Sequence, residues 1–167
     1  EMAAPKELVV QRITSIPAYV NEFKSAYGDN VKIDFEKIAD TIADYERTLI
    51  TPSRFDEFML GKHDALTKAE KDGLNTFIDK GCTSCHTSVG IGGTMQAFQV
   101  VGKYKFADVG DFKGDANGMV KTPTLRNIEE TAPYFHNGKV WSLKEAIKMM
   151  GSIQLGITIN DKDASSI

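Results

Sequence analysis

The sequence predicts an all-α protein, and three observations lead to that prediction. Apolar residues recur at three- and four-residue spacing, two Ser/Thr-x-x-Glu patterns mark helix starts, and no stretch gives a convincing strand signal. The chain has 167 residues, of which 41% are apolar. That length and composition suit one ordinary domain, or one domain with part of another.

Three helices are predicted before residue 52. The first covers 5–13, because a proline at position 5 suits a first helical turn, and the second covers 17–28, between a proline and a glycine. A third begins after Asp34, a suitable N-cap, and ends before Thr51-Pro52. Its apolar residues share one face: Phe35, Ile38, Ala39, Ile42, Tyr45 and Leu49.

Two capping boxes predict helices after residue 52. Thr67-x-x-Glu70 opens a helix that ends at Gly81, and Ser142-x-x-Glu145 opens one that ends near residue 151. Between them, residues 87–133 are glycine-rich and mostly loop, which is typical of a segment that wraps a ligand. Residues 158–167 indicate a helix of about one turn, so we interpret the chain as a segment of a longer one.

Composition excludes several classes of function. The formal charge is −3 and no block of like charge occurs, so neither nucleic acid nor an anionic membrane surface is an expected partner. No apolar run reaches the roughly 18 residues of a membrane span. The chain starts with Glu1 rather than Met, which indicates processing or excision from a longer protein.

The two cysteines lie in one Cys82-Thr-Ser-Cys85-His86 motif. In c-type attachment, the two thiols add to the haem vinyl groups, and the following His coordinates the iron. A thioredoxin-like pair needs a βαβ pattern, which is absent, and a zinc site needs further ligands that no other cysteine supplies. The sequence therefore predicts one covalently bound haem c and electron transfer through it.

The second axial ligand is predicted less sharply. On the helix that starts at Ser142, Met150 falls on one stripe with Leu143, Ala146 and Ile147, while Met149 lies about 100° away. Met150 is therefore either an iron ligand or a filler of the core, as Met often is. Met95 and Met119, in the long loop, compete for the ligand role.

Several motifs together resemble the second haem site of bacterial dihaem cytochrome c peroxidases. The resemblance extends over nearly the whole chain and rests on these segments: Tyr45–Pro52, Phe55–Asp56, Gly81–His86, Gly90–Gly93, Thr124–Asn127, Thr131–Gly138, Trp141–Ala146 and Met150–Gly151. It implies a cytochrome c domain over 53–167. Residues 1–52 are then a helical segment that resembles the end of a peroxidatic domain and the interdomain region.

The same resemblance implies roles for individual residues. His86 and Met150 would ligate the iron of a high-potential haem, and the backbone carbonyls of Thr131 and Pro133 match a calcium site between domains. Glu1, in a Glu-Met pair, resembles an acid of the peroxidatic pocket. Arg126 and His136 are candidates for holding haem propionates, although His136 is equally well explained as a loop histidine.

The resemblance also implies partners and a location. A small cytochrome c or copper protein would donate electrons, and a second haem in a separate peroxidatic domain would reduce hydrogen peroxide to water. Periplasmic localisation and a homodimer are further expectations, and this segment alone is expected to be inactive with peroxide. The alternatives are a stand-alone monohaem electron carrier, a dihaem oxidase that modifies Trp residues of a partner, and a zinc or thiol protein. The dihaem oxidase carries Tyr where this sequence has Met150.

Overall fold

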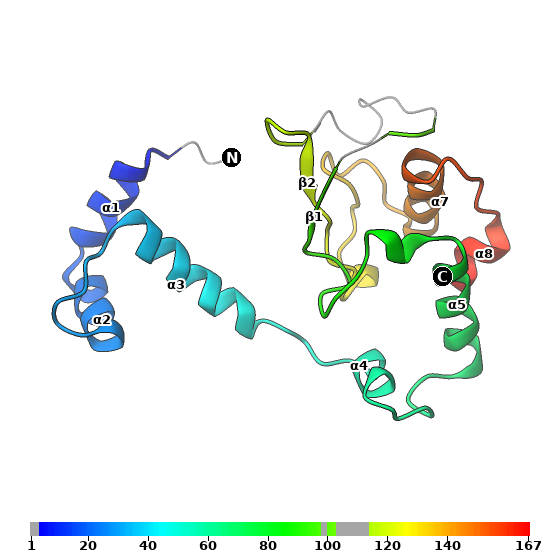
Figure 1. Ribbon diagram of the computed structural model, residues 1–167, viewed down its shortest axis with the longest axis horizontal. Helices are drawn as coiled ribbons and strands as arrows, with labels where there is room; N and C mark the ends of the chain where they lie inside the picture. The colour runs from blue at the N-terminus through cyan, green and yellow to red at the C-terminus, as the bar shows by residue number, and fades with distance from the viewer. Residues whose placement is uncertain (1–3, 98–99, 103–113) are drawn as a thin grey trace. The chain divides into compact units, whose positions relative to one another are not determined.

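The computed structural model describes residues 4–97, 100–102 and 114–167, and Figure 1 traces the chain. The chain divides into two compact units, Glu1–Ile50 and Thr51–Ile167. Over the described residues the structure is helix-rich, with seven α-helices, two 3₁₀ turns and two short strands. This agrees with the helical class expected from the sequence, and the strands are a feature that the sequence did not indicate.

Unit 1 (residues 1–50) consists of three helices: α1 (Lys6–Thr14), α2 (Pro17–Tyr27) and α3 (Phe35–Thr48). Their starts are the predicted ones. Pro5 precedes α1, α2 begins on a proline, and the Asp34 carboxylate accepts from the Lys37 N–H at 2.9 Å. Helix α1 contacts both α2 and α3.

Unit 2 (residues 51–167) holds the remaining helical elements: α4 (Arg54–Met59), α5 (Lys68–Asp79), η1 (Cys82–Ser84), η2 (Ile128–Glu130), α7 (Leu143–Gln154) and α8 (Asp161–Ser166). The Thr67–Glu70 capping box forms at the start of α5 as predicted. Helix α4 was not predicted, because six residues are too few to show a period.

Helix α7 runs past its predicted end near residue 151. Ser142 accepts from the Glu145 N–H, as expected, but the helix continues through Gly151 to Gln154. Gly151 is buried in close contact with Ile159, whose Cδ1 would lie 2.6 Å from an added Cβ. The glycine therefore serves close packing at this position and does not end the helix.

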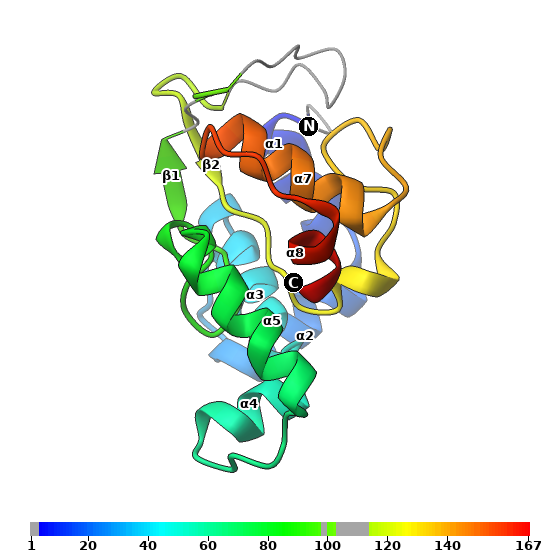
Figure 2. The same cartoon turned by 90° about the vertical axis from the view of Figure 1, so that its right-hand side faces the viewer.

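Helices α5 and α7 of unit 2 both pack against α8, as Figure 2 shows. Gly73 of α5 lies against the end of α8, where an added Cβ would meet the Ser166 carbonyl oxygen at 2.0 Å. Lys80 and Asp163 form an ion pair of 2.7 Å between the same segments. A separate buried cluster joins α7 to the preceding loop and consists of Tyr134, Val140, Ala146 and Ile153.

The long loop contains a short antiparallel pair of strands, β1 (Met95–Ala97) and β2 (Met119–Lys121), with Gln96 opposite Val120. Strands of three residues are too short to show alternation in the sequence, so the loop prediction missed them. The pairing holds two distant parts of the loop side by side. None of the described helices has the length and apolar character required to cross a membrane.

Candidate haem attachment site

The Cys-x-x-Cys-His motif folds into a single tight turn at the end of α5. Gly81 adopts a positive φ of 84°, which redirects the chain from the helix into η1. The N–H groups of Cys85 and His86 then donate to the Cys82 carbonyl at 3.3 and 3.1 Å. Both thiols are free and partly buried, and burial raises the pKa of Cys82. Two thiols and an imidazole are thus gathered on one turn, as c-type attachment requires.

The His86 ring has a fixed orientation. Its Nδ1 lies 3.2 Å from the Ile91 carbonyl oxygen, which can only accept, so Nδ1 carries the proton and Nε2 keeps a lone pair for a metal. Burial lowers the pKa of His86, while nearby backbone carbonyls of Ile91 and Pro123 oppose that shift. A neutral imidazole with an unprotonated Nε2 has the donor atom of an iron ligand, so the motif residues fit haem c.

Residues 87–93, named here the ligand loop, are held by the chain segment that follows β2. The Thr124 hydroxyl donates to the Gly90 carbonyl at 2.5 Å, and the Leu125 N–H donates to the Ile91 carbonyl at 3.3 Å. Gly92 lies so close to this segment that an added Cβ would meet the Pro123 carbonyl oxygen at 2.2 Å. The carbonyl that orients His86 therefore belongs to a firmly held loop.

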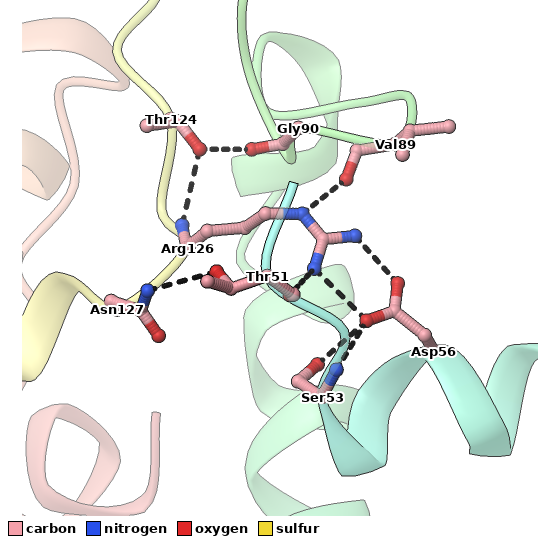
Figure 3. A network of polar contacts seen from close by, with 8 residues as sticks. All are labelled: Thr51, Ser53, Asp56, Val89, Gly90, Thr124, Arg126 and Asn127. Carbon is pink, nitrogen blue, oxygen red and sulfur yellow. Dashed lines mark hydrogen bonds and ion pairs between the residues drawn. The ribbon is translucent and has the colours of Figure 1, made fainter. Parts of the chain in front are cut away.

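Arg126 lies at the centre of a polar network (Figure 3). Its guanidinium pairs bidentately with Asp56 at 2.9 and 2.5 Å, and it also donates to the carbonyls of Val89 at 2.7 Å and Thr51 at 3.0 Å. Asp56 holds the pKa of Arg126 above its usual value, and the pKa of Asp56 is strongly lowered by the same contact. The propionate role of Arg126 stays a prediction, and the structure gives this side chain protein partners instead.

Met150 does not lie on the buried side of α7, where the sequence pattern predicted it. Met149, rather than Met150, packs against the buried cluster on α7, and Met150 remains 37% exposed. The correct core stripe is Ala146, Met149 and Ile153, at positions i, i+3 and i+7. The core-filling interpretation of Met150 is therefore wrong, while its role as an iron ligand stays a prediction. Of the competing methionines, Met95 and Met119 lie in β1 and β2.

The other predicted site residues are not brought together with His86 by any described contact. Thr131 and Pro133 are exposed on either side of a cis Ala132–Pro133 peptide bond, and His136 is exposed in the loop that follows. Glu1 lies outside the described residues. Within the described ranges, no three His, Cys, Asp or Glu side chains converge as a metal site would require.

Sequence reasoning missed two groups that shape this site. The Ile91 carbonyl is a backbone atom, and nothing in a residue type marks it as the acceptor for His86. Asp56 lies 70 positions before its partner Arg126, so no local spacing connects the two. In the sequence, Asp56 is marked only by the family resemblance, as part of Phe55–Asp56.

Comparison with known proteins supports the haem interpretation. A family model described as di-haem cytochrome c peroxidase matches residues 1–64. The chain is 39% identical to the cytochrome c551 peroxidase of Pseudomonas aeruginosa and 38% identical to that of Nitrosomonas europaea, over 100% of this chain and 52% of each relative. The cytochrome c peroxidase Ccp of Escherichia coli is 33% identical over 100% of this chain and 38% of the relative.

A solved structure gives the same result for the fold. The crystal structure of a MauG-like protein associated with microbial copper homeostasis matches with a TM-score of 0.57 and 29% identity, over 85% of this chain and 47% of that chain. The chain spans about half the length of the first curated relatives, 52% of each. With a Cys-x-x-Cys-His turn whose histidine is oriented through Nδ1, and relatives whose match covers the whole of this chain, the chain belongs to the dihaem cytochrome c peroxidase family, in which haem c is the cofactor.

Proposed function

We propose that this chain is the electron-input haem segment of a dihaem cytochrome c peroxidase. The observation that carries the proposal is the His86 imidazole, held by the Ile91 carbonyl directly after the two thiols of one turn. When bound, haem c supplies a one-electron Fe(III)/Fe(II) couple. In this proposal, electrons arrive from a small cytochrome c or copper protein and continue to a second haem that reduces hydrogen peroxide to water.

Each proposed residue has a separate physical task. Cys82 and Cys85 would hold the porphyrin through thioethers, and the His86 Nε2 would ligate the iron. The Ile91 carbonyl keeps the Nδ1 proton in place, which strengthens the imidazole as a ligand. Met150, which the protein core does not use, would supply a thioether ligand, which favours the reduced iron.

Unit 1 has a structural task in the same proposal. Its helices carry many exposed apolar side chains, and in the complete protein these pack against the peroxidatic domain. The carbonyls of Thr131 and Pro133 contribute to a calcium site at the boundary between domains, since carbonyl oxygens suit a hard cation. Haem attachment by thioethers, together with the family, supports a periplasmic location and periplasmic electron donors.

The test of the function compares two adjacent methionines. Met150→Ala is expected to remove the weak far-red band of the oxidised protein and to lower the haem midpoint potential, because the thioether favours Fe(II). Met149→Ala is the matched control, and it is expected to lower the melting temperature through its core contact while leaving the band intact. Intact mass and a reduced-minus-oxidised spectrum measure haem content first.

Three outcomes would contradict the proposal. A colourless wild-type protein with two alkylatable thiols would exclude haem altogether. A Met150→Ala variant with an unchanged band and potential would show that another group ligates the iron. Rapid donor-dependent peroxide turnover by this chain alone would show that one haem suffices, which favours a different division of labour.

A further inference from the structure

The contact between His86 and Ile91 depends on an unusual backbone. Ile91 has a φ of +48° and Ser88 a φ of +58°, both in the left-handed region that β-branched and other L-residues rarely adopt. Such conformations cost free energy and persist only where the surrounding contacts hold them. The internal bonds of the ligand loop are the Ile91 N–H to the Ser88 carbonyl at 2.9 Å and the Gly92 N–H to the Thr87 carbonyl at 2.8 Å.

Arg126 supplies an external support for this loop. Its Nε donates to the Val89 carbonyl at 2.7 Å, between the two strained residues (Figure 3). The backbone N–H of Arg126 also donates to the Thr124 hydroxyl, which in turn donates to the Gly90 carbonyl. Consecutive carbonyls of the loop, at Val89 and Gly90, are thus fixed from the same short segment, immediately before the carbonyl of Ile91.

The guanidinium is itself held in place by Asp56. The two carboxylate oxygens accept from both terminal nitrogens of Arg126, and the Ser53 N–H and hydroxyl donate to the same carboxylate at 2.7 and 2.9 Å. The Arg126 side chain is only 12% exposed, so solvent competes little for these bonds. Because both terminal nitrogens of the guanidinium are held, its Nε–H can point in only one direction, toward the Val89 carbonyl.

We propose that Arg126 and Asp56 form a positioning pair that sets the orientation of the His86 imidazole through the ligand loop. Among the described residues, no hydrogen bond or ion pair joins the pair to the thiols or the imidazole, so we take it to act on the iron ligand through the Val89–Ile91 backbone. Its removal lets the loop relax, lengthens the bond between Nδ1 and the Ile91 carbonyl, and makes the imidazole a weaker electron donor. The inference rests on the proposed function, because it takes His86 to be the iron ligand.

The test uses the haem-loaded protein and two readouts at His86. In Arg126→Gln, the Nδ1 proton, followed by NMR of ¹⁵N-histidine-labelled reduced protein, is expected to exchange with solvent about 3- to 10-fold faster, the factor that one net hydrogen bond makes. The midpoint potential is expected to rise, because a less basic imidazole stabilises Fe(III) less. Arg126→Lys is expected to recover only part of both effects, since an ammonium cannot replace the fork.

Arg54→Gln is the matched control. Arg54 forms a bidentate pair with Glu70 and donates to the Ala65 carbonyl in the same unit, and none of these groups belongs to the ligand loop. It is expected to lower the melting temperature while leaving Nδ1 exchange and the potential unchanged. If Arg126→Gln fails to fold, Asp56→Asn decides the question, because it keeps the Arg126 side chain but removes the charge that fixes the guanidinium, so that Nε is no longer held toward Val89 and the same changes in exchange and potential are expected.

The outcomes separate this inference from the proposed function. Unchanged exchange and potential in Arg126→Gln or, failing that, Asp56→Asn would overturn the positioning role, as would an equal change in Arg54→Gln. A wild-type protein that contains no haem would overturn the proposed function and the inference together.

Discussion

The two units are both helical, but they bury their apolar side chains very differently. Among the described residues, Ile38 is the one buried hydrophobic residue of unit 1, whereas eight lie in unit 2. Unit 1 instead exposes a set of large apolar side chains: Leu8, Ile16, Tyr19, Tyr27, Ile42, Tyr45, Leu49 and Ile50. Regular helices thus form in both units, but only unit 2 has a core of its own, which teaches that helix signals and core formation are separate properties of a sequence.

The largest expected effect is a loss of stability of unit 2 when the covalent attachment of the cofactor is removed. In the double variant Cys82→Ala/Cys85→Ala, haem would no longer be held covalently, and the glycine-rich loop would lose the group around which we propose that it folds. We expect unit 2 to lose at least about 4 kcal/mol, the contribution of a ligand present at a thousand times its Kd. Haem staining after denaturing electrophoresis and circular dichroism measure the change. Equal helix loss in both units would show that their stabilities are not separate.

A second prediction concerns the one buried apolar residue of unit 1. Ile38→Ala is expected to cost about 2–3 kcal/mol, at the lower part of the range for buried Ile, because the surrounding core is thin. Ile42→Ala, on the same helix and 54% exposed, is expected to change stability by less than about 0.5 kcal/mol. Chemical denaturation of both variants checks this. Similar losses would mean that Ile42 is buried in solution.

The third prediction concerns the close approach of α5 and α8 in unit 2. Gly73→Ala is expected to destabilise by about 1–3 kcal/mol, although Ala favours helix, because the new methyl group collides with the Ser166 carbonyl. Asn75→Ala, at an exposed position of the same helix, is expected to be neutral or slightly stabilising. Thermal unfolding followed at 222 nm, the usual helix signal, compares them. A stabilised Gly73→Ala would show that the two helices do not meet there.

The smallest expected effect depends on pH. Arg54, together with hydrogen bonds from Thr67, lowers the pKa of Glu70 from 4.5 to about 2, so the folded protein holds this carboxylate ionised below its unfolded pKa. The stabilisation is therefore complete above about pH 5 and is lost as pH falls toward 2. The difference in melting temperature between wild type and Glu70→Gln should shrink over that interval. Glu22→Gln, at an exposed position of α2, serves as control, and a constant difference for Glu70→Gln would exclude the ion pair as its cause.

Local signals explain which parts of the structure the sequence predicted. Pro17, Asp34 and Thr67 satisfy helix starts within three or four residues, so their patterns are readable without any tertiary knowledge. The position of the core on α7 was mistaken because the predicted end near residue 151 cut off Ile153. Without that residue, Met150 matched the remaining stripe better than Met149 did.

For the candidate haem site too, the sequence predicts the local motif but not the contacts between distant segments. Cys82, Cys85 and His86 form one motif whose chemistry depends on adjacency in sequence. The Arg126–Asp56 pair and the Ile91 acceptor depend on a chain path that brings distant segments together, and no residue spacing encodes it. The sequence therefore predicts the groups that would bond to the cofactor, and the structure was needed to find the groups that hold them.

The close approach of Gly92 to Pro123 has a consequence for how freely this sequence can change. An added Cβ at position 92 would meet three backbone atoms within 3.0 Å, none of which can rotate away, whereas one at position 93 would meet open space. In a saturation library sorted for red colour, position 92 should therefore return glycine alone. Position 93, despite its positive φ of 95°, should also return asparagine and aspartate. Two neighbouring glycines that look interchangeable in the printed sequence thus differ in how many other residue types their positions tolerate.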